Sequence, residues 1–247
     1  MPAPLSGSSL SPDEVGATLQ NQPSFDDLWG RPDLQQRLRI EVVHALWNAI
    51  EQLDSQVSSH GDRTASYAVA LGTTVGLPEA DLLDLYFAAL LHDLGRLTLP
   101  KEIAHRRGLL TAEEYAVVQC HPRMGAYLLE PIPFLRTPAV LIAHHHERWD
   151  GAGYPYGLRG PFIPLGSRIL AVADTFDALT SAEPPHRAHD PEAAMGLLRV
   201  LAGSQLDPEL VGTFAGLIGT LSASAAVQPP QKREGDHSAV SAMIPLS

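Results

Sequence analysis

The sequence is poor in cysteine, in positive charge and in long apolar runs. Its single cysteine, Cys120, excludes an internal disulfide framework, so we expect a cytoplasmic protein in which this thiol is a small buried side chain. The 17 lysines and arginines are outnumbered by 28 aspartates and glutamates, and the net charge of -11 argues against binding duplex nucleic acid or an acidic membrane. No apolar run is long enough for a membrane span, and the first 11 residues lack the features of a signal peptide.

The sequence also lacks strand patterns, because apolar and polar residues alternate over no more than a few positions. Helical spacing is frequent instead, and it predicts an all-α fold with a flexible arm over 1–31, a helical domain over 32–221 and a disordered tail over 222–247. Thr111 and Glu114 form a predicted capping box, and Met124, Tyr127 and Leu128 are expected to face inward. Helices are expected over 33–57, 60–75, 78–95, 111–119, from 121, and over 138–147, 166–181, 190–202 and 207–221.

Histidine, by contrast, is abundant, and 6 of the 11 histidines fall where a predicted helix begins or ends: His60, His92, His121, His144, His145 and His146. Asp93 follows His92 directly, and Asp174 interrupts an otherwise apolar helix, where a carboxylate is unfavourable unless it is paired or binds a metal. The alternative for the His92–Asp93 pair is a core histidine beside a carboxylate that bonds to backbone. Together the chain offers seven donors without a thiolate, a set that suits Fe, Mn, Co, Ni or Zn: His60, His92, Asp93, His121, His145, His146 and Asp174.

The order of these motifs is distinctive. His60 is followed by His92-Asp93-Leu94-Gly95, by His121-Pro122, by a block from His145 through Gly151, Gly153, Tyr154 and Pro155, and by Asp174-Thr175-Phe176-Asp177. From about Ile50 to Phe214 this order resembles the HD-GYP family, a branch of the HD metal-dependent phosphohydrolases. The resemblance implies an HD-domain helical bundle and an enzyme that hydrolyses cyclic di-GMP to a linear dinucleotide, GMP or both.

The resemblance also implies the metal ligands. One divalent ion, Fe or Mn, would be held by His60, His92, Asp93 and Asp174, and a second by Asp93 as a bridge with His121, His145 and His146. Two such ions lower the pKa of the attacking water and offset charge on the phosphate. Asp93 and Arg96 are the expected catalytic residues, whereas His144 has no ligand position in the pattern.

The sequence departs from the family pattern at three places. Gln56 stands where members with a third metal carry a glutamate, so two metals are expected. Arg96 replaces the usual lysine and is expected to bind phosphate. Glu183 stands where an arginine that contacts substrate is usual, and Arg187 is the expected replacement.

The loop that carries Gly151, Gly153, Tyr154 and Pro155 has two interpretations. One is purely structural, in which the glycines permit the turn and Tyr154 and Pro155 stiffen it. The other is functional, in which the loop shapes the cleft or presents a surface to a signalling partner. The sequence also leaves open whether the chain forms a homodimer. Two alternatives to the phosphodiesterase remain, namely a receptor or interaction module with little or no activity, prompted by Glu183, and an HD hydrolase of another nucleotide.

Overall fold

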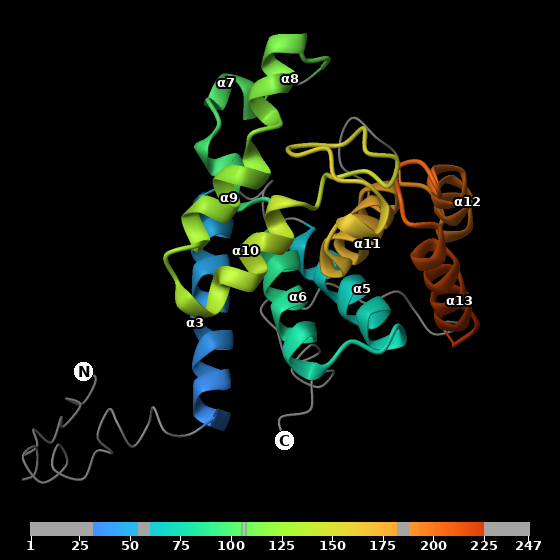
Figure 1. The fold of residues 1–247 in the computed structure, drawn as a ribbon, viewed down its shortest axis with the longest axis horizontal. Helices are drawn as coiled ribbons and strands as arrows, with labels where there is room; N and C mark the ends of the chain where they lie inside the picture. The colour runs from blue at the N-terminus through green and yellow to red at the C-terminus, as the bar shows by residue number, and fades with distance from the viewer. Residues whose placement is uncertain (1–31, 54–59, 105, 107, 182–187, 225–247) are drawn as a thin grey trace, which may run out of the picture. The chain divides into compact units, whose positions relative to one another are not determined.

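The structure, a computed structural model, describes residues 32–53, 60–104, 106, 108–181 and 188–224, and its regular elements there are helices (Figure 1). Within these ranges no strand occurs, and a single bridge joins Ala202 and Leu206, so the predicted all-α class is confirmed. The predicted arm over 1–31 and most of the predicted tail over 222–247 lie outside the described residues, whereas residues 222–224 are helical and extend the last predicted helix. By its contacts the chain divides into one unit of residues 1–42 with Ser247 and another of residues 43–246.

The elements follow the predicted order, with short helices added in the connector before residue 111, at Pro133–Leu135 and at Gly160–Phe162. They are α3 (Pro32–Leu53), α5 (Gly61–Thr74), α6 (Glu79–Leu91), η1 (Leu94–Thr98), α7 (Lys101–Ala104), α8 (Ala112–Val118), α9 (His121–Leu129), η2 (Pro133–Leu135), α10 (Arg136–Ala143), η3 (Gly160–Phe162), α11 (Leu165–Thr180), α12 (Pro191–Leu201) and α13 (Pro208–Ser224). None of the helices in the described part of the chain is both long and apolar enough to cross a membrane.

Local sequence signals fix several helix starts. At α8, the Thr111 hydroxyl accepts from Glu114 N while the Glu114 carboxylate accepts from Thr111 N, which confirms the predicted capping box. At α12, Asp190 caps the helix by accepting from Ala193 N at 2.8 Å. The end of α10 differs from the prediction, because the helix stops at Ala143 and not at 147. His144, His145 and His146 therefore follow the helix and can turn together toward its neighbours.

The core is built around α6, whose residues from Leu85 to Leu91 are all buried. α6 packs on α5 and α10, and α11 packs on α5 (Figure 1). Between α5, α11 and α13, the rings of Tyr67, Phe176 and Phe214 meet edge to face, with the two phenylalanine centroids 5.1 Å apart. This packing holds the ends of α5 and α6 and the middle of α11 in a common region.

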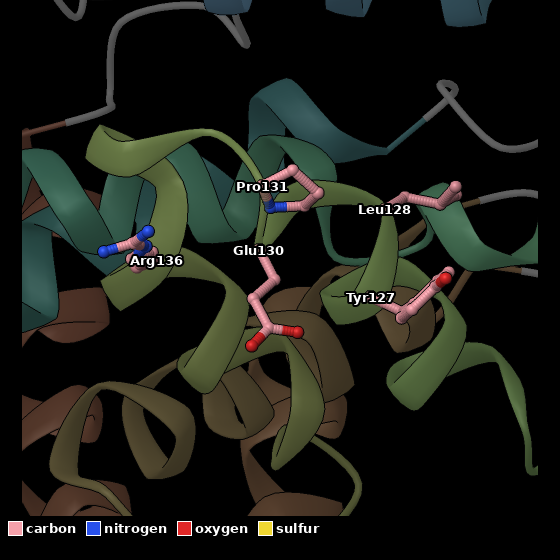
Figure 2. Close-up of a pocket in the computed structure, with 5 residues that line it drawn as sticks. All are labelled: Tyr127, Leu128, Glu130, Pro131 and Arg136. Atoms are coloured by element: carbon pink, nitrogen blue, oxygen red, sulfur yellow. The ribbon is translucent and has the colours of Figure 1, made fainter.

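Two predictions about side-chain burial are wrong. Cys120 is exposed. Tyr127 and Leu128 are 68% and 43% exposed and line an open surface pocket with Glu130, Pro131 and Arg136 (Figure 2). The reason is that α9 buries the neighbouring face, formed by His121, Pro122, Gly125 and Leu129, against η1 and α10. Apolar spacing alone did not separate these two faces of a short helix.

Candidate metal centre

Helix ends bring the predicted metal ligands together. His60 directly precedes α5, His92 follows α6, His121 begins α9, and His145 and His146 follow α10. Asp93 lies between α6 and η1, and Asp174 projects from the middle of α11. The candidate ligands thus come from five helices that the core holds in place.

The donor atoms form two clusters. Donors of His60, His92 and Asp93 lie within 4.8 Å of one another, as do donors of His121, His145 and His146. Each cluster is largely buried, with His92, Asp93, His121 and His145 below 9% exposure. Each has the size and the nitrogen and oxygen atoms of a site for a divalent transition metal.

Asp93 connects the two clusters, because its two carboxylate oxygens face opposite ways. Oδ2 lies 3.4 Å from His60 Nε2 in the first cluster, and Oδ1 lies 3.4 Å from His121 Nε2 in the second. Asp174 joins the first cluster, where its Oδ1 is 3.6 Å from both His60 Nδ1 and His92 Nε2. Asp93 thus directs one oxygen toward each cluster.

Hydrogen bonds to the backbone orient three of the imidazoles. Nδ1 of His92, His121 and His145 each lies 2.7–2.8 Å from the carbonyl oxygen three residues earlier. A carbonyl only accepts, so Nδ1 carries the proton and Nε2 keeps its lone pair. Among the described residues, Nε2 of His121 and Nε2 of His145 are buried without a hydrogen-bond partner. Unsatisfied buried nitrogens of this kind fit a bound cation.

The ionisation of the two clusters differs. Burial, reinforced by neighbouring histidines, lowers the pKa of His121 and His145 and brings the pKa of His146 to about 4. Burial also lowers the pKa of His60, but Asp93, Asp174 and Asp177 outweigh it and raise this pKa to about 9. At neutral pH the second cluster therefore offers neutral imidazoles, whereas an ion that binds His60 must displace a proton.

Arg63 and Asp177 support the first cluster, although no role was predicted for either residue from the sequence. The Arg63 guanidinium donates to both oxygens of the buried Asp177 carboxylate, at 2.7 and 3.0 Å, and to Ser181 Oγ at 2.7 Å. Asp177 Oδ2 in turn lies 3.7 Å from His60 Nδ1. The signal for this contact is spacing, because Arg63 follows His60 by three residues and Asp177 follows Asp174 by three, one helical turn in each case.

The expected substrate contacts are placed only in part. The Arg96 guanidinium lies 3.5 Å from Asp93 Oδ2, and its side chain is 39% exposed, so it borders the centre and remains accessible. Gln56, Glu183 and Arg187 lie outside the described residues.

The loop with Gly151, Gly153, Tyr154 and Pro155 starts directly after the histidine triplet. Its backbone is tied to the connection between α12 and α13, where Trp149 N donates to Gln205 O and Asp150 N to Ser204 O. Arg168 of α11 lies 5.7 Å from the Trp149 ring centroid and donates to Asp207 Oδ2 at 2.6 Å. The loop is thus held at its base by residues far along the chain.

We expect Arg168→Met to destabilise this base. The substitution keeps much of the apolar stem but leaves the buried Asp207 carboxylate without its cation, which should lower the free energy of unfolding by about 3 kcal/mol. Chemical denaturation measures the change, and Arg199→Met on α12, for which no ion pair is recorded among the described residues, is the matched control. An Arg168→Met protein as stable as the wild type would contradict this role.

Comparisons with known proteins agree with this architecture. The family model described as HD domain matches residues 44–210. The cyclic di-GMP phosphodiesterase response regulator RpfG of Xanthomonas campestris is 39% identical over 72% of this chain and 48% of its own length. The 3'3'-cGAMP-specific phosphodiesterase 2 of Vibrio cholerae is 33% identical over 76% of this chain and 36% of its own length. The chain thus spans about half, or less, of the length of these relatives.

A solved structure shares the fold. Bd1817, described as an HDG"Y"P protein from Bdellovibrio bacteriovorus, superposes with a TM-score of 0.57 at 19% identity, covering 78% of this chain and 67% of its own. The HD domain model matches more than half of the sequence, which establishes the family to which the chain belongs. The chain therefore belongs to the HD domain family, and within it the order of its motifs resembles the HD-GYP branch.

Proposed function

We propose that this chain is a phosphodiesterase with two metal ions that hydrolyses cyclic di-GMP to a linear dinucleotide, GMP or both. The observation that carries the proposal is Asp93, whose two oxygens each face a different cluster of imidazoles at 3.4 Å. We assign His60, His92, Asp93 and Asp174 to one ion, and Asp93, His121, His145 and His146 to the other. This domain would extend over 32–221.

The candidate metal ligands and the arginines have different roles in the proposed reaction. Two divalent ions held by these ligands, Fe or Mn by resemblance, would supply the activated water and neutralise charge on the phosphodiester. The Nδ1 bonds of His92, His121 and His145 fix each ring with its lone pair toward the centre, so no reorientation is needed on binding. Arg96 is placed beside Asp93 with an accessible guanidinium that can bind a non-bridging phosphate oxygen. Arg187 is proposed to bind substrate as well.

The cyclic di-GMP assignment is supported by relatives at 39% and 35% identity whose names specify that substrate. A second candidate substrate is 3'3'-cGAMP, because another relative, at 33% identity, is named as specific for it. Both are cyclic dinucleotides with two phosphodiesters, so the same metal centre would be able to hydrolyse either substrate. Discrimination would depend on contacts to the second base.

The test is turnover on both substrates. Protein loaded anaerobically with Mn(II) or Fe(II) should convert cyclic di-GMP to linear product, resolved by chromatography, and His92→Ala should lose at least about a hundredfold in rate. His44→Ala is the matched control, because His44 contacts Tyr86 and belongs to neither cluster. Faster turnover of 3'3'-cGAMP would reassign the substrate, and tight binding without turnover of either would favour a receptor.

We infer that the protein is cytoplasmic. We also infer that the loop binds a signalling partner. Tyr156 and Phe162, in and just after the loop, are 58% and 83% exposed and would be available to contact a partner. The homodimer remains a prediction, and a measurement of the oligomeric state in solution tests it.

A further inference from the structure

His146 differs from the other buried candidate ligands in how it is oriented. His92, His121 and His145 each use Nδ1 to bond a backbone carbonyl. Within the described residues, no hydrogen bond to the His146 ring is recorded, although a ligand imidazole usually has one that sets its orientation. Some other contact must therefore hold this ring.

The ring of Tyr154 supplies that contact. It lies over the His146 ring with a centroid separation of 4.9 Å and an interplanar angle of 30°. The same two residues are joined through the backbone, where Tyr154 N donates to His146 O at 3.2 Å. The rings of His145 and His121 also contact the His146 ring, with centroid separations of 4.0 and 4.9 Å, but both belong to candidate ligands, which leaves Tyr154 as the supporting ring from outside the cluster.

Glu147 fixes the position of Tyr154. Its side chain is completely buried, and its two carboxylate oxygens accept from Tyr156 N at 2.8 Å and from Leu158 N at 2.9 Å. These amides lie two and four residues beyond Tyr154. A buried carboxylate that accepts from two backbone amides holds that segment of backbone firmly, because losing either hydrogen bond leaves the buried charge unsatisfied.

We propose that Tyr154 and Glu147 are positioning residues for the second metal ion. The Glu147 carboxylate holds the loop, the loop holds the Tyr154 ring, and the ring orients the His146 imidazole toward His121 and His145. The proposal rests on the proposed two-ion centre, and it gives the Gly-Tyr-Pro loop a role in metal binding besides any partner contact.

The experiment compares metal affinity in variants of Tyr154 by calorimetric titration of the metal-free protein with Mn(II). Tyr154→Leu removes the ring, and we expect one of the two ions to bind at least about tenfold more weakly while the other is unchanged. Tyr154→Phe keeps the ring and should bind both ions within about twofold of wild type. Tyr156→Leu is the matched control, because that ring lies against His144, 5.1 Å away, which has no ligand role.

A second arm uses Glu147→Gln, which keeps the side-chain size but presents an amide N–H₂ to a backbone donor. The same selective loss of one ion is expected, whereas Glu192→Gln, on α12, which carries none of the candidate ligands, should leave both affinities unchanged. Wild-type affinities in Tyr154→Leu would overturn the positioning role whatever Glu147→Gln does to folding. A wild-type chain that binds fewer than two ions would overturn the proposed centre itself.

Discussion

Asp93→Asn is expected to reduce the rate of cyclic dinucleotide hydrolysis about a thousandfold, corresponding to about 4 kcal/mol of lost transition-state stabilisation. The physical reason is the position of the carboxylate between His60 Nε2 and His121 Nε2, at 3.4 Å from each. Asparagine offers one neutral oxygen, and its N–H₂ group must face one of the two clusters. A neutral amide is a weak ligand for Fe or Mn, so the variant should hold at most one ion firmly.

The fold should survive this substitution. Asp93 is buried among histidines, which hold its pKa well below its usual range although burial opposes them, so the neutral amide loses contacts that outweigh the burial of the charge. Melting curves in the presence of chelator should therefore show a somewhat lower melting temperature for the variant, with a cooperative transition in both proteins. Asp190→Asn is the matched control, because asparagine caps a helix as well as aspartate does and α12 carries none of the candidate ligands. Asp93→Asn activity within tenfold of wild type would contradict the bridging role.

Gly95→Ala is expected to lower the free energy of unfolding by about 3 kcal/mol, which is about 6–12 °C in melting temperature. A methyl group on Gly95 would overlap the backbone carbonyl of His121 and would lie 2.6 Å from Gly125 N. Both are main-chain atoms of α9 and cannot rotate away as a flexible side chain would. Relief requires η1 and α9 to separate, which also moves Asp93 away from His121.

The stability change and the metal change should therefore occur together in Gly95→Ala. Thermal unfolding with and without Mn(II) measures both, and we expect the variant to gain less stability from metal than wild type does. Gly196→Ala on α12 is the matched control, because its added methyl group would have no other atom within 4 Å and alanine favours a helix interior by about 0.5–1 kcal/mol. A Gly95→Ala protein as stable as Gly196→Ala would mean that η1 and α9 do not require this close approach.

The helices and their ends were largely predictable because their signals are local. Thr111 with Glu114, and Asp190 before Pro191, satisfy the first backbone amides of their own helices, so sequence alone determines those starts. The histidines at helix ends could be predicted for the same reason. The family resemblance then supplied what local signals do not, namely that the ends of separate helices share one centre.

Contacts between residues that only the folded chain brings together were not predicted from the sequence. Arg63 and Asp177 are 114 residues apart, and their pairing follows from how α5 and α11 pack. Glu147 looks like an ordinary charged residue after a helix until the loop returns with Tyr156 N and Leu158 N. Likewise, α10 stops at Ala143 with the amides of His144 and His145 bonded to carbonyls three residues earlier, and no residue with a strong stop preference marks that position.

The most direct test of the central claim is the number of metal ions bound per chain. Protein purified anaerobically, reconstituted with Mn(II) or Fe(II) and freed of excess metal should contain two ions per chain by elemental analysis, and Asp93→Asn prepared in parallel should contain at most one. One ion or none in folded wild-type protein would contradict a centre in which Asp93 bridges two clusters of histidines.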